Sequence, residues 1–508
     1  MFIQIHSAAL LGIDAQPVRI EIDISKSWPG FQIVGLPDVA IQEAKERIRV
    51  AWKNTLSDWP FGKGITINLA PADLRKEGAL YDLPMALGMY LAHKEILTTD
   101  FDHAVMVGEL ALDGTVRRVN GVLSITLYAA ANGYTSIFVP AENIGEAQLV
   151  KGINIYGIKN LCQIIDHVTG EAFLQPNNES YAEQSKISLN YDNDMSFIKG
   201  QEFVKRGLEV AASGAHNILL SGSPGSGKTL LARSMPSILP PLNQNEALEV
   251  TKIYSAAGLL PTNTPIIRER PFRSPHHSAS SVALVGGGNI PRPGEISLAH
   301  RGVLFLDEFP EFPRFTLESL RQPLEDGEVT IARAQGTFTF PARFMLVASQ
   351  NPCPCGFVGD PERECICAPF MITKYQKRIS GPLLDRIDLH ITVPRVQFEK
   401  LNSEVPIESS EKIRNRVIEA RERQALRFQG LRFGTNAEMK NREIKLYCKL
   451  PDKAVDLLRQ AVTKLHLSAR SYYRIIKLSR TIADMSSNEN IMFDHVAEAL
   501  QYRGMSNY

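Results

Sequence analysis

The chain has 508 residues and a formal net charge of +1, with 44% apolar and 22% charged residues. This length predicts two to four domains, each large enough for its own hydrophobic core. The balanced charge excludes a protein that is basic overall, so any nucleic-acid surface must be local. No apolar run reaches membrane-spanning length, and Met1–His6 alternates like a strand, not a signal peptide, so we expect a cytoplasmic protein without a membrane partner.

The order of patterns divides the chain into segments. The first mixes alternating strands with amphipathic helices, one of which begins near Asp38. The predicted buried face of that helix comprises Ile41, Ala44, Ile48 and Trp52. A polar stretch without periodicity predicts a linker, nucleotide-binding motifs follow it, and the remainder is mainly helical in pattern. The expected boundaries are 1–173, 174–193, 194–395 and 396–508.

A phosphate loop follows the apolar strand Asn217–Ser221. Residues 222–229 fit the pattern G-x-x-x-x-G-K-[ST], and a helix is expected from Leu230 to about Met235. In this pattern backbone N–H groups cradle the phosphates, Lys228 reaches the β and γ oxygens, and Thr229 offers its hydroxyl to Mg²⁺. The predicted nucleotide-binding residues of the loop are Gly222, Ser223, Pro224, Gly225, Ser226, Gly227, Lys228 and Thr229.

A second motif supports nucleotide hydrolysis. Val303–Leu306 is a continuous apolar run, typical of a strand buried on both faces, and it ends in two carboxylates. We expect Asp307 to share the Mg²⁺ with Thr229, and Glu308 to align or deprotonate the attacking water. The chain has no Asn-Lys-x-Asp run for a guanine base, so the predicted cofactors are ATP and Mg²⁺.

Four of the six cysteines gather in one short segment. They form a C-x-C…C-x-C set made of Cys353, Cys355, Cys365 and Cys367. Four thiolates suit a structural, tetrahedral Zn²⁺ site without an open position. The usual zinc spacing is C-x₂-C, so the alternative is four reduced thiols in an ordered loop. Cys162 and Cys448 stand alone in apolar surroundings and are expected in the core.

Two loops are candidates for contact with DNA. Residues 283–295 contain glycines and prolines that interrupt a helix, and they include Arg292. Residues 328–340 are predicted to form a hairpin that turns at 334–336. Its tip carries Arg333 and Gln335. These three side chains could follow a phosphate backbone without reading bases, and the alternative is that they are ordinary exposed loop residues.

Several longer strings resemble one family over nearly the whole chain. They are FQIVGLPD from residue 31, NLAPADLRKEG from 68, PFRSPHHSAS from 271, PRPGEISLAHRGVLFLDEFPEF from 291 and ASQNPCPCG from 348. The chain thereby resembles the YifB/ComM family of magnesium-chelatase-like AAA+ ATPases. The resemblance implies an α/β multidomain protein with a Lon-protease-like N-terminal domain of the ribosomal S5 domain 2-like fold. It also implies an AAA+ core with a parallel sheet, a helix-2 insert and a pre-sensor hairpin, followed by a C-terminal helical lid.

The same resemblance implies roles for residues outside the two nucleotide motifs. Asn351 resembles sensor 1, which helps to hold the water near the γ-phosphate. Arg386 resembles the arginine finger that is offered to the nucleotide of a neighbouring subunit in a homo-hexamer. Arg470 resembles sensor 2, and Arg474 and Arg378 are the alternatives for these arginine roles.

The N-terminal segment lacks the residues of a Lon-type peptidase. The stretch that corresponds to the Lon nucleophile, 75–82, contains no serine, and the stretch that corresponds to its base, 120–125, contains no lysine. A Ser–Lys dyad needs both groups. We therefore expect this domain to have a structural and DNA-guiding role and no protease activity.

The function that the resemblance implies is a hexameric, ATP-dependent DNA motor. Such a helicase would act on single-stranded and branched DNA and promote branch migration in homologous recombination during natural transformation, with recombinase-associated proteins as further partners. Two alternatives remain open. One is a chelatase-type or chaperone ATPase that remodels a protein partner, and the other is a recombination mediator that uses ATP only as an assembly switch.

Overall fold

The chain folds into two compact units. The computed structural model describes residues 1–503 apart from Ser27, Ser57, 179–190, Asn263, 289–290, 334–335, 397–406, Arg432 and His466. The first unit comprises Met1–Ile187 together with Gln244–Ile267, and the second comprises Ser188–Asn243 together with Arg268–Tyr508. Among the described residues no helix is long and apolar enough to cross a membrane.

The first unit is built on a seven-stranded mixed sheet with the order β3-β4-β2-β1-β5-β8-β9. β1 pairs antiparallel with β2, and β2 with β4, whereas β5, β8 and β9 continue from β1 in parallel. The strands are β1 (Phe2–Leu11), β2 (Asp14–Ser25), β3 (Gly30–Val34), β4 (Gly64–Ala70), β5 (Ala104–Met106), β8 (Ser136–Pro140) and β9 (Asn154–Ile158), and a two-stranded sheet comprises β6 (Glu109–Leu110) and β7 (Val116–Arg117).

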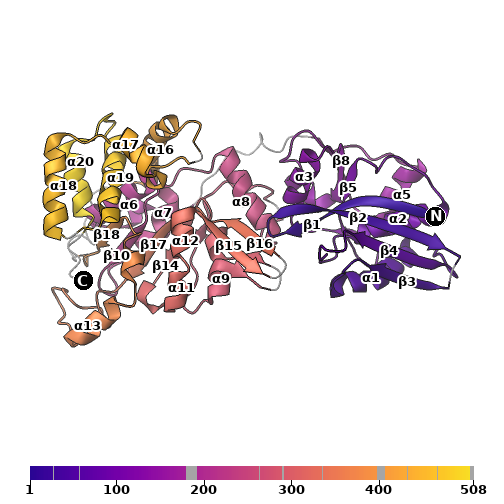
Figure 1. Cartoon of the computed structure of the whole chain (residues 1–508), viewed down its shortest axis with the longest axis horizontal. Helices are drawn as coiled ribbons and strands as arrows, with labels where there is room; N and C mark the ends of the chain where they lie inside the picture. The colour runs from indigo at the N-terminus through magenta and orange to yellow at the C-terminus, as the bar shows by residue number, and fades with distance from the viewer. Residues whose placement is uncertain are drawn as a thin grey trace. The chain divides into compact units, whose positions relative to one another are not determined.

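Helices cover this sheet, as the indigo and purple part of Figure 1 shows. They are α1 (Val39–Thr55), α2 (Asp82–Lys94), α3 (Val122–Ala131), α4 (Ile144–Ala147) and α5 (Leu161–Thr169). Asp38 caps α1 by accepting a hydrogen bond from the backbone N–H of Ile41, at 2.8 Å. Ile41, Ala44, Ile48 and Trp52 are buried. The apolar face predicted from the sequence is therefore confirmed.

One segment between the two nucleotide motifs belongs to the first unit. It begins with α8 (Gln244–Ala256), which packs against α3. The backbone N–H of Gly121 donates to the carbonyl of Ser255 at 3.2 Å, and the Ser255 hydroxyl donates to the buried Glu146. Arg118 donates to the carbonyl of Leu260 at 2.8 Å. The sequence pattern assigns residues 244–267 to the ATPase core, and it did not reveal this packing.

The second unit is built on a five-stranded parallel sheet with the order β11-β14-β17-β10-β18. Its strands are β10 (Ile218–Ser221), β11 (Phe272–Arg273), β14 (Val303–Leu306), β17 (Met345–Gln350) and β18 (Leu389–Thr392). Every residue of β14 and β17 is buried, as expected for strands covered on both faces. All five carboxyl ends reach the same edge of the sheet, where ligands bind in folds of this kind.

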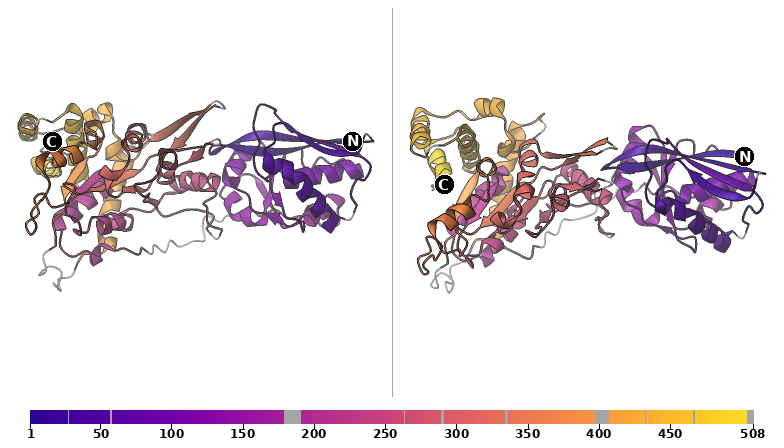
Figure 2. Two further views of the ribbon diagram at one scale, coloured as in Figure 1. Left: turned by 90° about the horizontal axis from the view of Figure 1, so that it is seen from below. Right: turned by 60° about the horizontal axis from the view of Figure 1, so that its bottom comes forward.

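Helices and two hairpins surround this sheet. The helices are α6 (Glu202–Gly214), α7 (Lys228–Ile238), α9 (Ser281–Val285), α10 (Glu295–Leu298), α11 (Arg314–Glu318), α12 (Arg321–Asp326), α13 (Pro369–Gln376) and α14 (Gly381–Leu384). The hairpins are β12 (Gly286–Gly287) with β13 (Arg292–Pro293), and β15 (Glu328–Arg333) with β16 (Gly336–Pro341). In Figure 2 the orange β15–β16 hairpin extends away from the parallel sheet.

The C-terminal region of the second unit is helical, and it is drawn in light orange and yellow in Figure 1. It contains α16 (Ser410–Arg427), α17 (Asn441–Tyr447), α18 (Asp452–Leu465), α19 (Ala469–Met485) and α20 (Phe493–Gln501). α16 and α19 both pack against α6 of the core. The α/β class, the parallel sheet and the helical C-terminal region expected from the sequence are confirmed.

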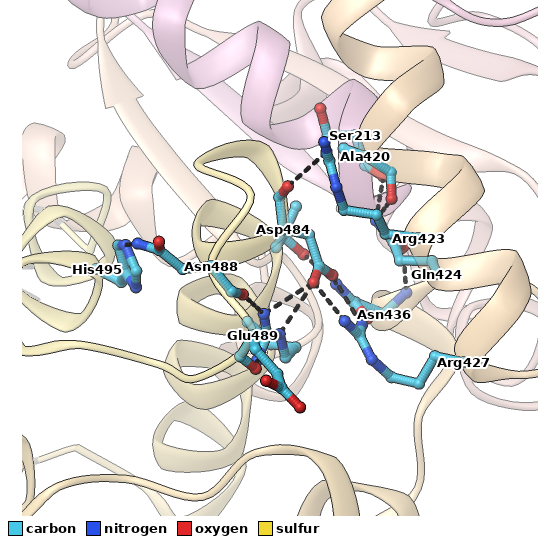
Figure 3. Close-up of polar contacts among 12 residues, drawn as sticks. Ser213, Ala420, Arg423, Gln424, Arg427, Asn436, Asp484, Asn488, Glu489 and His495 are labelled. Carbon is cyan, nitrogen blue, oxygen red and sulfur yellow. Dashed lines mark hydrogen bonds and ion pairs between the residues drawn. The ribbon is translucent and has the colours of Figure 1, made fainter.

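A buried polar network joins these helices (Figure 3). Asp484, with a side chain that is 1% exposed, accepts hydrogen bonds from Arg427, Arg480 and Asn436. Arg480 also donates to the carbonyls of Asn488 and Glu489, each at 2.6 Å. These bonds pin α16, α19 and the loop after α19 to one another.

Replacing Asp484 by alanine should lower the free energy of unfolding by about 3–5 kcal/mol, because it leaves the buried Arg480 and the 17% exposed Arg427 without their counter-charge. The matched control is Asp456→Ala. Asp456 pairs with Arg459 at 2.8 Å, but these side chains are 59% and 73% exposed, so the loss should stay below about 1 kcal/mol. Urea unfolding followed by circular dichroism measures both variants. Equal losses would contradict the structural role of the network.

Candidate nucleotide-binding site

The phosphate loop lies between β10 and α7, as the sequence predicts. The helix begins at Lys228 and ends at Ile238, somewhat longer than expected. Gly222 cannot be replaced without displacement of the loop, because a Cβ there would lie 2.4 Å from the carbonyl oxygen of Val393. The Gln201 side chain donates to the carbonyls of Ser226 and Pro394, at 2.8 and 2.9 Å. Gln201 is a positioning residue that the sequence analysis missed.

The two predicted magnesium ligands meet at the end of the sheet. The Thr229 hydroxyl donates to Oδ2 of Asp307 at 2.9 Å. The other oxygen of Asp307 accepts a hydrogen bond from the hydroxyl of Ser349 on β17. A hydroxyl and a carboxylate at this separation are suited to share the coordination shell of one Mg²⁺. Ser349, which holds Asp307, was not identified from the sequence.

Glu308 follows Asp307, and its side chain is largely exposed. Its backbone is left-handed, with φ of 51°, and its side chain is 56% exposed. The Glu308 N–H donates to the Ser349 hydroxyl at 3.3 Å, and Nδ1 of His277 lies 3.3 Å from the Glu308 carboxylate. An unusual backbone conformation fixed by neighbours is a common feature of functional residues. His277 belongs to the PFRSPHHSAS string, but its position was assigned no role.

Lys228 and Asn351 also converge on the phosphate loop. The Lys228 ammonium donates to the carbonyls of Gly222 and Ser223 at 2.7 and 3.0 Å, and to Oδ1 of Asn351 at 3.2 Å. Burial lowers the pKa of Lys228, and the charge of Asp307 opposes that shift. The Asn351 amide, through Lys228, and the Asp307 carboxylate, through Thr229, are thus both bonded to the phosphate loop.

Arg386 is held within its own chain. Its side chain is 10% exposed and pairs with Glu325, and Nη1 donates to the carbonyl of Pro382 at 2.8 Å. A role across a subunit boundary therefore requires that this ion pair opens when subunits assemble. The sequence pattern identifies Arg386 but does not indicate that Glu325 pairs with it.

The three other arginines differ in their surroundings. Arg474 is fixed by the buried Asp388 and donates to the carbonyl of Arg386 at 2.7 Å, so it supports the segment that carries Arg386. Arg470 lies exposed at the start of α19. Arg378 is 50% exposed and pairs with Glu311 after the Asp-Glu motif. These placements favour Arg470 over Arg474 as a group that can move toward a nucleotide.

A buried histidine links Asp388 to the helical region. Nε2 of His216 lies 2.7 Å from the hydroxyl of Thr481 on α19, and Nδ1 lies 3.5 Å from Asp388. Burial lowers the pKa of His216 below its ordinary value of 6.5, although Asp388 opposes the shift.

This histidine predicts acid sensitivity. In the unfolded chain this imidazole takes up a proton near pH 6.5, whereas in the folded chain it stays neutral to lower pH. Its contribution to the free energy of unfolding is therefore fully present above about pH 6.5 and is lost as the pH falls below that value. One imidazole contributes at most about 1.4 kcal/mol per pH unit. Urea unfolding of the wild type and of His216→Gln is measured from about pH 7.5 to about pH 5. As the pH falls, the free energy of unfolding should decrease less steeply in the variant than in the wild type. Parallel slopes would contradict the assignment.

The four clustered cysteines lie close enough together to bind one metal ion. All four Sγ atoms lie within 4.8 Å of one another, and three of the separations are 3.4, 3.5 and 3.6 Å. Four sulfurs bound to one Zn²⁺ at about 2.3 Å would be about 3.8 Å apart, which is close to these three separations. The backbone N–H of Phe357 lowers the pKa of Cys355 to about 6, whereas burial and the neighbouring thiols raise the pKa of Cys365 to about 12 and also that of Cys367. Cys448 is buried and Cys162 is half-buried.

The two hairpins place the candidate DNA-binding residues close together. Arg292 and Arg333 are exposed, whereas Gln335 lies outside the described residues. A Cβ on Gly287 would lie 3.2 Å from the Arg333 guanidinium, and a Cβ on Gly286 would lie 3.3 Å from Ile331. β12–β13 therefore packs directly beside β15–β16. The sequence predicts both loops, but not that they are neighbours.

The stretches 75–82 and 120–125 take part in structural contacts within the first unit. Asp82 begins α2 and pairs with Arg47 at 2.7 Å; its burial raises its pKa to about 6. Gly121 caps α3 and bonds to Ser255. Both stretches thus contribute to packing.

Comparison with known proteins gives matches along the whole chain. Three family models match the chain. The model described as "Subunit ChlI of Mg-chelatase" matches residues 20–143, "Magnesium chelatase, subunit ChlI" matches 194–401, and "Magnesium chelatase, subunit ChlI C-terminal" matches 407–503. "Uncharacterized protein YifB" of Escherichia coli (strain K12) and "Competence protein ComM" of Haemophilus influenzae are each 43% identical, over 99% of this chain and 97% of their own length. "Magnesium-chelatase 38 kDa subunit" of Rhodobacter capsulatus is 30% identical over 31% of this chain and 49% of its own.

Proposed function

The chain belongs to the YifB/ComM family of magnesium-chelatase-like AAA+ proteins, and we propose that it is an ATP- and Mg²⁺-dependent hexameric motor that moves on DNA and promotes branch migration. The observation that carries the DNA part is the pair of adjacent hairpins with exposed Arg292 and Arg333. Guanidinium groups on neighbouring loops can follow the phosphates of a strand without reading its bases.

The chemistry of ATP hydrolysis is assigned to the carboxyl edge of the parallel sheet. With ATP bound, Lys228 would neutralise the β- and γ-phosphates, Thr229 and Asp307 would hold the Mg²⁺, and Glu308 would take the proton of the attacking water. Asn351 orients that water, and Arg386 of a neighbouring subunit stabilises the charge that develops on the γ-phosphate. A Mg²⁺ held there would neutralise phosphate charge, and the residues would supply position and proton transfer.

We also propose that the four clustered cysteines hold one structural Zn²⁺. The support is that their four sulfurs lie within 4.8 Å of one another, close enough to share one ion. A closed set of four protein ligands leaves no position for a substrate, so the ion would order the loop and take no part in hydrolysis.

The similarity to a competence protein favours DNA as the substrate, and recombination during natural transformation as its setting. A chelatase-type ATPase that acts on a protein would share the same nucleotide site. The two are distinguished by whether DNA stimulates ATP hydrolysis. A mediator that uses ATP only for assembly would bind DNA but would not displace a strand.

The test of the DNA interface is a double variant, Arg292→Ala/Arg333→Ala, in the full-length protein. It should lose the stimulation of ATP hydrolysis by single-stranded DNA, and the slope of log affinity against log salt should fall by about 1 for each lost phosphate contact. Arg459→Ala is the control, because Arg459 is 73% exposed in the helical region. If both variants keep the stimulation, the hairpins do not bind DNA.

A further inference from the structure

The four-cysteine loop, defined here as residues 353–367, is in contact with the phosphate loop. Gly356 has a left-handed backbone, with φ of 86°, and a Cβ at this position would lie 2.4 Å from Cδ and 2.6 Å from Cγ of Pro224. Pro224 is the third residue of the phosphate loop. The two loops thus touch so closely that a methyl group between them would displace one or the other.

A second contact runs through Arg395, which follows β18. Its Nε lies 3.3 Å from the hydroxyl of Ser223 in the phosphate loop and 3.0 Å from Oδ2 of Asp360 in the four-cysteine loop. Arg395 also bonds to Glu362 at 3.0 Å, and its guanidinium lies over the Phe357 ring. Asp360 is fixed in turn, because its other oxygen accepts backbone hydrogen bonds from two residues of its own loop.

The start of the loop is tied to the same site. Asn351, which accepts a hydrogen bond from Lys228, precedes Cys353 by two residues. The N–H of Gly356, whose Cα faces Pro224, donates to the Cys353 sulfur at 3.2 Å. The segment that would bind the metal is therefore the segment that supports the phosphate loop.

We propose that a zinc ion on Cys353, Cys355, Cys365 and Cys367 holds the phosphate loop in its nucleotide-binding shape, so that metal loading sets the affinity for ATP. This inference rests on the zinc site proposed above. Without the ion, the four thiols are not held together, and the four-cysteine loop is less well ordered. That loop supports Ser223 and Pro224, so the phosphate loop then becomes less ordered as well. ATP must then order the phosphate loop as it binds, and that cost weakens the complex.

The metal arm of the test uses the full-length protein and a fluorescent ATP analogue. Elemental analysis should find about one Zn²⁺ per chain. Removal of zinc with a chelator that spares Mg²⁺ should weaken nucleotide binding by about tenfold, and added zinc should restore it. Because linkage is reciprocal, saturating nucleotide should raise the affinity for zinc by the same factor. Absence of bound zinc would reject the metal site itself, whereas bound zinc with unchanged nucleotide affinity after its removal would reject only the coupling.

The contact arm compares two glycines of the same loop. Gly359 also has a left-handed backbone, with φ of 74°, but a Cβ there would meet nothing within 4 Å. Gly356→Ala and Gly359→Ala therefore carry similar backbone strain, and only the first pushes on Pro224. We expect Gly356→Ala to weaken nucleotide binding by about tenfold with zinc content preserved, and Gly359→Ala to bind like the wild type.

A third variant separates this contact from a general loss of folding. Pro224→Ala removes the two ring atoms that the new methyl group would strike. In that background the added effect of Gly356→Ala should fall to within about twofold, the range of independent sites. Thermal unfolding of each variant reports the fold. Equal effects of Gly356→Ala in the two backgrounds, or equal effects of the two glycine variants, would overturn the proposal.

Discussion

Replacement of Glu308 by glutamine should leave ATP binding intact and slow hydrolysis by about 10²–10⁴-fold, the contribution of a general base. Glutamine keeps the size of the side chain but cannot accept the proton of water. The carboxylate is 56% exposed and lies beside His277, beyond the end of β14, where an attacking water can reach it. Steady-state phosphate release measures the rate, and a fluorescent ATP analogue measures binding.

The control for this variant is Glu318→Gln on α11. Glu318 pairs with Arg321 at 2.7 Å and is 29% exposed, so it shares the charge but not the position of Glu308. It should hydrolyse ATP at the wild-type rate. Lys228→Ala provides the complementary result, because the loss of the cation on the phosphates should weaken binding itself. Normal turnover by Glu308→Gln would mean that another group activates the water.

The second large effect is expected at Arg386. If this arginine completes the active site of a neighbouring subunit, Arg386→Ala should lower hydrolysis by about 10³–10⁵-fold, the range known for arginine fingers. Within its own chain Arg386 pairs with Glu325, which is 55% exposed. Glu325→Gln should therefore keep most of the activity, since it frees the arginine without removing it.

Mixing separates a role across the subunit boundary from one within the chain. Arg386→Ala and Lys228→Ala proteins should each be inactive, but a mixed ring would contain interfaces with an intact phosphate loop and an intact finger. Part of the ATPase activity should return on mixing. No recovery despite demonstrated co-assembly would place Arg386 in its own active site. A Glu325→Gln protein as inactive as Arg386→Ala would instead indicate that the ion pair is structural.

The sequence predicts the parts of the site that depend on local pattern. The phosphate loop fixes a strand before it and a helix after it, and the apolar run before Asp307 is typical of a strand buried on both faces. The hairpin at Glu328–Pro341 is equally local, because alternation and a glycine turn specify it.

The missed features depend on contacts between distant segments. Ser349 supports Asp307 from another strand, and a serine at the end of a strand has no distinctive pattern. Glu325 neutralises Arg386 from 61 residues away, which only the fold can reveal. Residues 244–267 pack with the N-terminal unit because α8 buries its apolar side against α3, although their position in the chain suggests the ATPase core.

The most direct test of a DNA motor is strand exchange on a three-stranded substrate with a fluorescently labelled strand. Wild-type protein with ATP and Mg²⁺ should displace the labelled strand, and a non-hydrolysable ATP analogue should not support displacement. Glu308→Gln should bind the same DNA in the presence of ATP and leave the strand in place. Displacement by Glu308→Gln, or DNA-stimulated hydrolysis by the wild type without any displacement, would contradict the account of an ATP-driven motor.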